Sequence, residues 1–220
     1  FHSIQDEQVF SLVASSQKQH KSNTFQIKNE NLTLLKSVAI YGANAAGKSN
    51  LIKAFMTIKK IVTKSAIVQR DEKLPVLPFL LGQNENEPTE FKISFITQGV
   101  RYVYDFSATN DRIFKEQLFV YPNDRVQRLF LRTYNKKTNE YTYEYRNLIG
   151  EKKLWEKSTR ENVLFLSTAI QLNSQQLKPV FDWFTHLNIS RNFGEFGNSL
   201  DITIDSFKKQ PKEIIDYLKT

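Results

Sequence analysis

The sequence predicts an α/β protein with α+β character, and three observations lead to this prediction. A glycine-rich loop at 42–49 lies between an apolar run and an amphipathic helical segment. Residues 89–146 alternate apolar and polar side chains, with turn residues between the runs, as an antiparallel β-meander does. Helical periodicity returns after residue 155. We therefore expect a core that carries the loop and the meander over 1–155 and a helical lobe over 156–220.

The residues before the loop are expected to form strands. Residues 4–14 look like one strand, and a short strand is expected around residues 25–27 within a polar stretch. Residues 34–41 form an apolar run that ends at the first glycine of the loop, as a buried strand would.

The loop is a complete G-x-x-x-x-G-K-[ST] motif, formed in order by Gly42, Ala43, Asn44, Ala45, Ala46, Gly47, Lys48 and Ser49. Its glycines allow backbone conformations and a close phosphate approach that a β-carbon would obstruct. The backbone N–H groups of this loop and the following helix N-terminus attract phosphate. Lys48 would reach the β- and γ-phosphates, and the Ser49 hydroxyl would bind Mg²⁺.

The motif therefore predicts ATP and Mg²⁺ as ligands, although a phosphate-binding loop does not distinguish ATP from GTP. Residues 42–50, which include Asn50, are the predicted nucleotide-binding residues. Lys48 is the predicted catalytic residue because it would stabilise charge on the transferred phosphoryl group. Ser49 is the predicted metal ligand.

The remaining elements follow from periodicity and turn residues. Residues 50–62 place apolar side chains at helical spacing with lysines opposite, and two prolines at 75 and 78 exclude helix there. Gln98-Gly99 is a two-residue hairpin signal between two alternating runs, so a meander of about five strands is expected. An N-cap at 158–161 is expected to begin the first of three helices, which are predicted over 162–172, 175–187 and 211–218.

Composition limits the class of protein. The chain has 220 residues, of which 40% are hydrophobic, so it can bury a sizeable core. It has no cysteine, which excludes disulfides and thiol catalysis and favours a cytoplasmic location. No run of apolar residues is long enough for a membrane span. The net charge of +8 is consistent with a solvated basic surface or with a nucleic-acid partner.

The order of elements resembles the N-terminal half of an ABC-type ATPase head, the class shared by SMC, RecF and OLD proteins. Residues 160–167 read Arg-Glu-Asn-Val-Leu-Phe-Leu-Ser, and this stretch resembles bacterial AAA-family ATPases of abortive-infection and anti-phage systems. Further stretches that resemble the same family lie at 41–54, 88–91, 99–102 and 177–184. The resemblance implies ATP held between two heads of a homodimer, an effector protein such as a nuclease or toxin, and a role in anti-phage defence.

The resemblance also implies elements that the sequence does not supply. Residues 1–4 resemble the end of an Asn-Phe-x-Ser motif that normally follows a first strand. No apolar strand ends in Asp-Glu, and no signature loop is evident, so we expect a fragment or truncated protein in which ATP hydrolysis depends on residues supplied from elsewhere. The alternative is a nucleotide-occupied scaffold or sensor domain that binds a protein or nucleic acid with little turnover.

Four other candidates have both a functional and a structural interpretation. Gln83 could contact Mg²⁺ and the attacking water, or it could lie in a polar turn. Arg160 could contact phosphate, or it could pair near a helix cap. The histidines lack metal-ligand spacing. Several strand aromatics could stack bases or simply pack in the sheet; they are Tyr102, Tyr104, Phe119, Tyr121, Tyr141, Tyr143 and Tyr145.

Overall fold

A computed structural model describes residues 1–16, 21–27, 32–79 and 87–189 of the chain. The chain divides into two compact units, Phe1–Leu187 and Asn188–Thr220. Nearly all of the described residues belong to the first unit, and the structure below is the structure of that unit. Gln83 and the helix predicted over 211–218 lie outside the described residues. The boundary predicted after residue 155 stays a prediction.

The described part of the chain contains four α-helices, a five-stranded antiparallel sheet and a two-stranded sheet, which confirms the α/β prediction. In chain order its strands and helices are β1 (Thr24–Gln26), β2 (Thr33–Leu35), α1 (Lys48–Lys64), β3 (Thr89–Thr97), β4 (Val100–Ala108), β5 (Ile113–Tyr121), β6 (Gln127–Asn135), β7 (Glu140–Tyr145), α2 (Lys152–Ser158), α3 (Phe165–Gln171) and α4 (Lys178–His186). Short 3₁₀ turns occupy Lys21–Asn23, Ser65–Ile67 and Pro122–Asp124.

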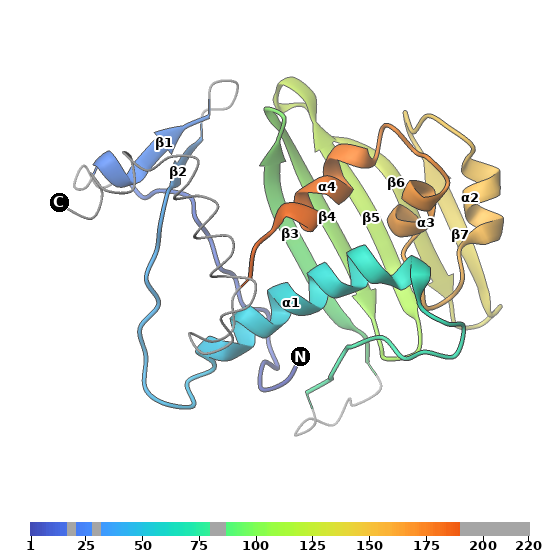
Figure 1. Cartoon of the computed structure of the whole chain (residues 1–220), viewed down its shortest axis with the longest axis horizontal. Coiled ribbons are helices and arrows are strands. Elements are labelled where there is room, and N and C mark those ends of the chain that lie inside the picture. The colour runs from blue at the N-terminus through green and yellow to red at the C-terminus, as the bar shows by residue number, and fades with distance from the viewer. Residues whose placement is uncertain (17–20, 28–31, 80–86, 190–220) are drawn as a thin grey trace, which may run out of the picture. The chain divides into compact units, whose positions relative to one another are not determined.

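The large sheet is a simple meander in which each strand pairs with the next, in the order β3-β4-β5-β6-β7 (Figure 1). The hairpin predicted at Gln98-Gly99 is confirmed, with positive φ angles of 53° and 75° at these two residues. Two positive φ angles are typical of the type I′ turn that matches the twist of the flanking strands. A bulge between Leu118 and Phe119 shifts the register where β5 pairs with β6.

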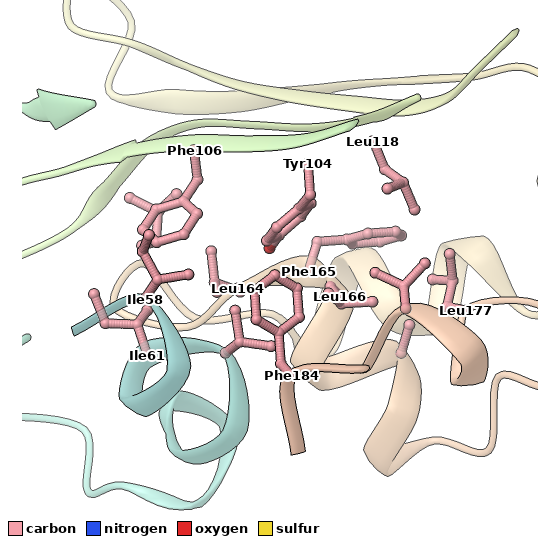
Figure 2. Packing of buried hydrophobic residues seen from close by; sticks show 14 of the residues in the cluster. Ile58, Ile61, Tyr104, Phe106, Leu118, Leu164, Phe165, Leu166, Leu177 and Phe184 are labelled. Carbon is pink, nitrogen blue, oxygen red and sulfur yellow. The ribbon is translucent and has the colours of Figure 1, made fainter. Parts of the chain in front are cut away.

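Helices α1, α3 and α4 lie against one face of this sheet and enclose the core (Figure 2). Aromatic and aliphatic side chains from the strands point toward those of the helices. Phe95 from β3, for example, stacks on Trp183 of α4 with ring centroids 4.2 Å apart. The residues that meet at the centre include Tyr104, Phe106 and Leu118 from the sheet and Ile58, Ile61, Phe165 and Phe184 from the helices.

Most of the strand tyrosines belong to this core rather than to a base-stacking surface. Tyr104 is buried, and Tyr102, Tyr143 and Tyr145 pack against the core cluster. Tyr141 donates its hydroxyl hydrogen to the Ile113 carbonyl at 2.8 Å. The structure therefore supports the packing interpretation of the inward-facing tyrosines.

The three predicted helices that fall within the described residues are present, and the bounds of all three differ from the prediction. Helix α1 is longer than the predicted 50–62, and α4 is shorter than the predicted 175–187. Helix α3 begins at Phe165 rather than at residue 162, because its first N–H groups are bound by a distant carboxylate and not by a local cap. Helix α2 was not predicted, and it is short, with Trp155 as its only fully buried side chain.

The strands predicted before the loop were largely wrong. β1 agrees with the strand predicted around 25–27, but residues 4–14 contribute only an isolated bridge from Val13 to Leu34. The strand predicted over 34–41 is limited to β2, and the Val38, Ile40 and Tyr41 side chains are exposed. A strand persists only where neighbouring backbone groups pair with it. Within the described residues, backbone pairing on this run reaches no further than Lys36, whose N–H donates to the Asn23 carbonyl at 2.8 Å.

Candidate functional site

The predicted phosphate loop lies between β2 and α1 and leads directly into the helix. Gly47 precedes the first helical residue and has a φ angle of 89°, a left-handed conformation that favours glycine. Ala45 also has a positive φ angle, of 63°. At Gly42 an added β-carbon would meet the Ala46 β-carbon at an ordinary contact distance of 3.5 Å. In this conformation the backbone therefore requires glycine at position 47, because of its positive φ angle, but not at position 42.

Lys48 folds back onto its own loop. Its ammonium group donates hydrogen bonds to the Gly42 carbonyl at 2.6 Å and to the Ala43 carbonyl at 2.7 Å. Two uncharged carbonyl acceptors thus hold the positive charge against the loop. A phosphate oxygen is a stronger acceptor for an ammonium than a carbonyl because the hydrogen bond is charge-assisted on both sides.

The start of α1 offers free donors beside this ammonium. Within the described residues, the backbone N–H groups of Lys48 and Ser49 donate no hydrogen bond, whereas the Asn50 N–H donates to the Gly47 carbonyl at 2.8 Å. The Ser49 side chain is exposed. A magnesium-bound triphosphate requires hydrogen-bond donors for its phosphates and a ligand for its metal ion. The free N–H groups and the ammonium are such donors, and the serine hydroxyl is such a ligand. These residues therefore fit Mg-ATP.

The first residues of the chain lie beside the loop, which the sequence suggested only through the motif resemblance of residues 1–4. The Ser3 hydroxyl accepts a hydrogen bond from the Asn50 side-chain amide. The Phe1 ring packs edge-on against Phe91 of β3, with centroids 5.3 Å apart. Burial, followed by the positive charge of Lys53, lowers the pKa of His2. Asn50 therefore holds the N-terminal segment against the helix.

Arg160 and Asn162 hold a turn of the backbone and do not contact the loop. The Arg160 guanidinium donates to the Val68 carbonyl at 2.7 Å. The Asn162 side-chain amide donates to the carbonyls of Arg70 and Glu72 at 3.1 and 3.0 Å. This geometry supports the structural interpretation of Arg160.

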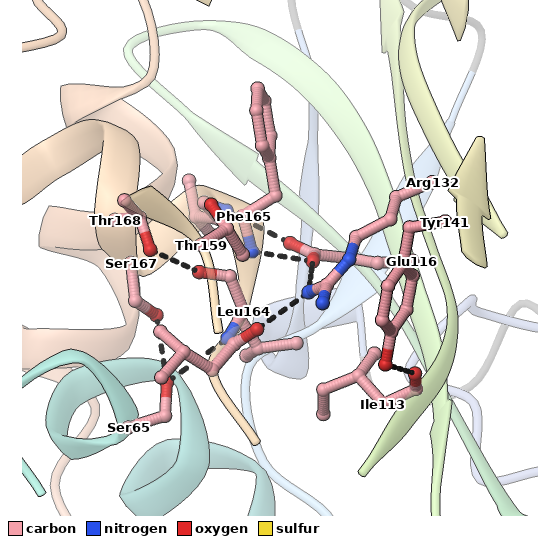
Figure 3. Close-up of polar contacts among 12 residues, drawn as sticks. Ser65, Ile113, Glu116, Arg132, Tyr141, Thr159, Leu164, Phe165, Ser167 and Thr168 are labelled. Carbon is pink, nitrogen blue, oxygen red and sulfur yellow. Dashed lines mark hydrogen bonds and ion pairs between the residues drawn. The ribbon is translucent and has the colours of Figure 1, made fainter. Parts of the chain in front are cut away.

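A second polar cluster is buried between β5, β6 and α3 (Figure 3). The Glu116 carboxylate accepts hydrogen bonds from the Phe165 N–H at 2.6 Å, the Leu166 N–H at 2.9 Å and the Tyr104 hydroxyl at 2.9 Å. Arg132 lies 3.8 Å from the carboxylate, and both side chains are 0% exposed. Burial raises the pKa of Glu116, while Arg132 and the hydrogen bonds lower it.

This cluster fixes the fold rather than serving as a reaction site. The Arg132 guanidinium donates to the carbonyls of Val163 at 2.6 Å and Arg160 at 2.9 Å, and it stacks over the Tyr141 ring at 4.0 Å. Glu116 and Arg132 together thus determine where the 160–166 segment runs and where α3 begins. No sequence pattern revealed this pair, because its two members lie on different strands and the backbone groups that they bind in the 160–166 segment are 28 to 50 residues away along the chain.

Among the described residues, no ion pair joins an acidic side chain to the loop. Within the described residues there is no group of three or more His, Asp or Glu side chains suited to a metal ion. Asp105 lies on the sheet and accepts from the Gln117 amide at 3.0 and 2.9 Å. Asp182 pairs with Lys178 one helical turn earlier on α4. None of the helices in the described part combines the length and apolarity that a membrane crossing requires.

Comparison with known families gives a match over most of the chain. The model of the family described as "AAA domain, putative AbiEii toxin, Type IV TA system" matches residues 37–211, which include the phosphate loop, the meander and the following helices. No curated protein and no solved structure matches the chain.

Proposed function

Because the chain belongs to this AAA-domain family of P-loop ATPases, we propose that residues 42–50 bind Mg-ATP. The observation that carries the proposal is the position of Lys48 beside the free N–H groups at the start of α1. On binding, the ammonium exchanges the Gly42 and Ala43 carbonyls for phosphate oxygens. Bound Mg²⁺ neutralises phosphate charge, and the Ser49 hydroxyl is the protein ligand that holds it.

The test is the affinity of the Lys48→Ala variant for a fluorescent ATP analogue, measured in excess Mg²⁺. A hydrogen bond to a charged group contributes about 1.5–3 kcal/mol, so the dissociation constant should rise roughly 10- to 150-fold. Lys60→Ala is the matched control, since Lys60 is an exposed lysine of the same helix. An affinity of Lys48→Ala within twofold of the parent would refute the proposal.

The metal role of Ser49 has a separate test. We expect Ser49→Ala to weaken nucleotide binding in Mg²⁺ but not in excess EDTA, because the hydroxyl acts through the metal. An equal loss in both conditions would assign Ser49 to direct phosphate contact instead.

A second candidate is nucleotide binding with little turnover. It is favoured by the lack, among the described residues, of a carboxylate in contact with the loop. General-base activation of water needs an acceptor within hydrogen-bond reach of the substrate. Phosphate release by the purified chain distinguishes the two: turnover well above the Lys48→Ala background supports an ATPase that is active alone, and no turnover supports the binding domain.

We further propose a cytoplasmic role in defence against phage, with a homodimer of ATPase heads that controls a nuclease or toxin. The support is the description of the family, which names an AbiEii toxin of a type IV TA system. Sedimentation of the parent and of Lys48→Ala, each with and without Mg-ATP, tests the dimer. Nucleotide-dependent dimerisation of the parent alone is the expected result.

A further inference from the structure

Helix α1 carries a row of lysines that the nucleotide site does not use. The helix contains five lysines and no acidic residue in its 17 residues. Lys48 binds the loop carbonyls, and Lys59 donates to the carbonyls of Thr185 at 3.1 Å and Leu187 at 2.6 Å near the end of α4. The other three, Lys53, Lys60 and Lys64, are called the α1 lysine row below.

The spacing of the row places its members on one side of the helix. At 3.6 residues per turn, positions 53, 60 and 64 fall within about 40° of one another around the axis, and they extend over about 16 Å along it. The buried side chains Ile58, Ile61 and Val62 face the core. Lys60 and Lys64 are exposed, and Lys53 is half-buried.

The charges of the row are not neutralised by the part of the chain that the structure describes. Ion pairs in that part engage Lys73, Lys115, Lys153 and Lys178, but none engages a lysine of α1. The row therefore presents three positive charges along one line of a rigid element.

A linear polyanion fits this surface better than a membrane or an apolar partner. The apolar side chains of the second half of α1, Ile58, Ile61 and Val62, are already packed in the core, so this half of the helix has no apolar face to lay into a bilayer. A strand of duplex DNA carries one phosphate per 3.4 Å of helix axis, so a row of about 16 Å spans roughly five phosphates. Flexible lysine side chains can each reach one of these phosphates as a point charge.

We propose that the α1 lysine row binds the phosphate backbone of duplex nucleic acid, without reading its sequence. Lys53, Lys60 and Lys64 each contact one phosphate. This contact places the duplex on the helix that begins at the phosphate loop, outside the loop itself. Binding of this kind depends steeply on salt, because each neutralised phosphate releases condensed counterions.

The experiment measures binding of the full chain to a fluorescent DNA duplex of about 20 base pairs over a range of about 50–200 mM salt. The test variant replaces all three row lysines with Gln. Its matched control replaces Lys92, Lys137 and Lys157 with Gln, which removes the same charge from exposed lysines on β3, the β6–β7 turn and α2. Circular dichroism checks that both variants fold.

The row variant should lose about 2.7 units from the slope of log K against log salt, which is three contacts at about 0.9 each. In the parent these contacts account for about a 40-fold fall in affinity between 50 and 200 mM salt. The control should keep the parental slope. Equal losses in both variants, no binding of the parent at low salt, or binding of the parent to anionic vesicles but not to DNA would each overturn the proposal.

Two further measurements, on variants already described, separate this inference from the nucleotide site. The row variant should bind the fluorescent ATP analogue as the parent does, and Lys48→Ala should bind DNA as the parent does. A parallel loss of both ligands in either variant would show one shared phosphate site, and it would overturn the separate role of the row.

Discussion

Replacement of Glu116 by Ala tests the central structural claim, that a buried carboxylate positions α3. The substitution leaves the Phe165 and Leu166 N–H groups and the Tyr104 hydroxyl without their acceptor. It also leaves the Arg132 charge buried without its carboxylate partner, although the guanidinium retains its two carbonyl acceptors. These groups have no route to water, because both side chains are 0% exposed.

The expected cost follows from this geometry. Removing one partner of a buried ion pair destabilises a protein by about 3–5 kcal/mol. Glu116→Gln should cost less, about 1.5–3 kcal/mol, because one oxygen still accepts hydrogen bonds while the charge is lost. For a domain of this size, each kcal/mol lowers the melting temperature by about 2–4 °C, so Glu116→Ala should melt roughly 6–20 °C below the parent.

The assay is urea denaturation followed by far-UV circular dichroism, with Glu144→Ala as the control. Glu144 pairs with Arg128 at 2.5 Å, but its side chain is 59% exposed, so its loss should cost less than about 1 kcal/mol. The reasoning is refuted if Glu116→Ala is no less stable than Glu144→Ala. A double-mutant cycle with Arg132→Met then measures how much of the loss belongs to the pair.

Two further predictions concern local packing and pH. Gly150→Ala should destabilise the chain by about 2–4 kcal/mol, since its φ is +119° and the new β-carbon would lie 2.3 Å from the Trp155 ring. Gly99→Ala, where φ is +75° and nothing lies within 4 Å, should cost only about 1 kcal/mol in the same denaturation assay, and equal costs would contradict this account. Burial raises the pKa of Tyr141 to about 12, so the unfolded chain loses this proton first and stability should fall as the pH rises from about 10 to 12. Tyr141→Phe should remove this part of the alkaline loss, as measured by denaturation at each pH, and an unchanged pH profile would contradict the assignment.

Local sequence patterns predicted the elements whose partners are close along the chain. The five strands of the meander follow one another, and Gln98-Gly99 supplies a turn with the required positive φ angles. The periodicity of α1 predicted its buried face, and the phosphate motif predicted that a glycine with special backbone geometry precedes Lys48. In each case the residues that determine the element are adjacent in the sequence or only a few positions apart.

The elements that were missed depend on distant residues. The start of α3 is set by Glu116, which lies 49 residues before Phe165. The Ser158–Glu161 segment looks like a helix cap, yet its groups bind elsewhere. The Arg160 carbonyl accepts a hydrogen bond from Arg132, and the Arg160 guanidinium donates one to the Val68 carbonyl. The run from 34 to 41 has the composition of a strand, but composition cannot show which backbone groups will find a partner. The hydrogen bonds from Lys48 to two carbonyls could not be predicted from the sequence either, because they depend on how the loop folds.

Two hydrogen bonds join the C-terminal end of α1 and the turn after it to the start of α3, and we call this contact the α1–α3 junction. The Ser167 hydroxyl donates to the Val62 carbonyl at 2.7 Å. The Ser65 hydroxyl accepts from the Leu164 N–H at 3.3 Å (Figure 3). A 17-residue helix is a stiff rod about 26 Å long. A tilt of about 2° at the loop end therefore moves this junction by about 1 Å, which is enough to break hydrogen bonds of this length. The residue that begins α1 at the phosphate loop and the residues that begin α3 are thus connected by one rigid helix and two hydrogen bonds.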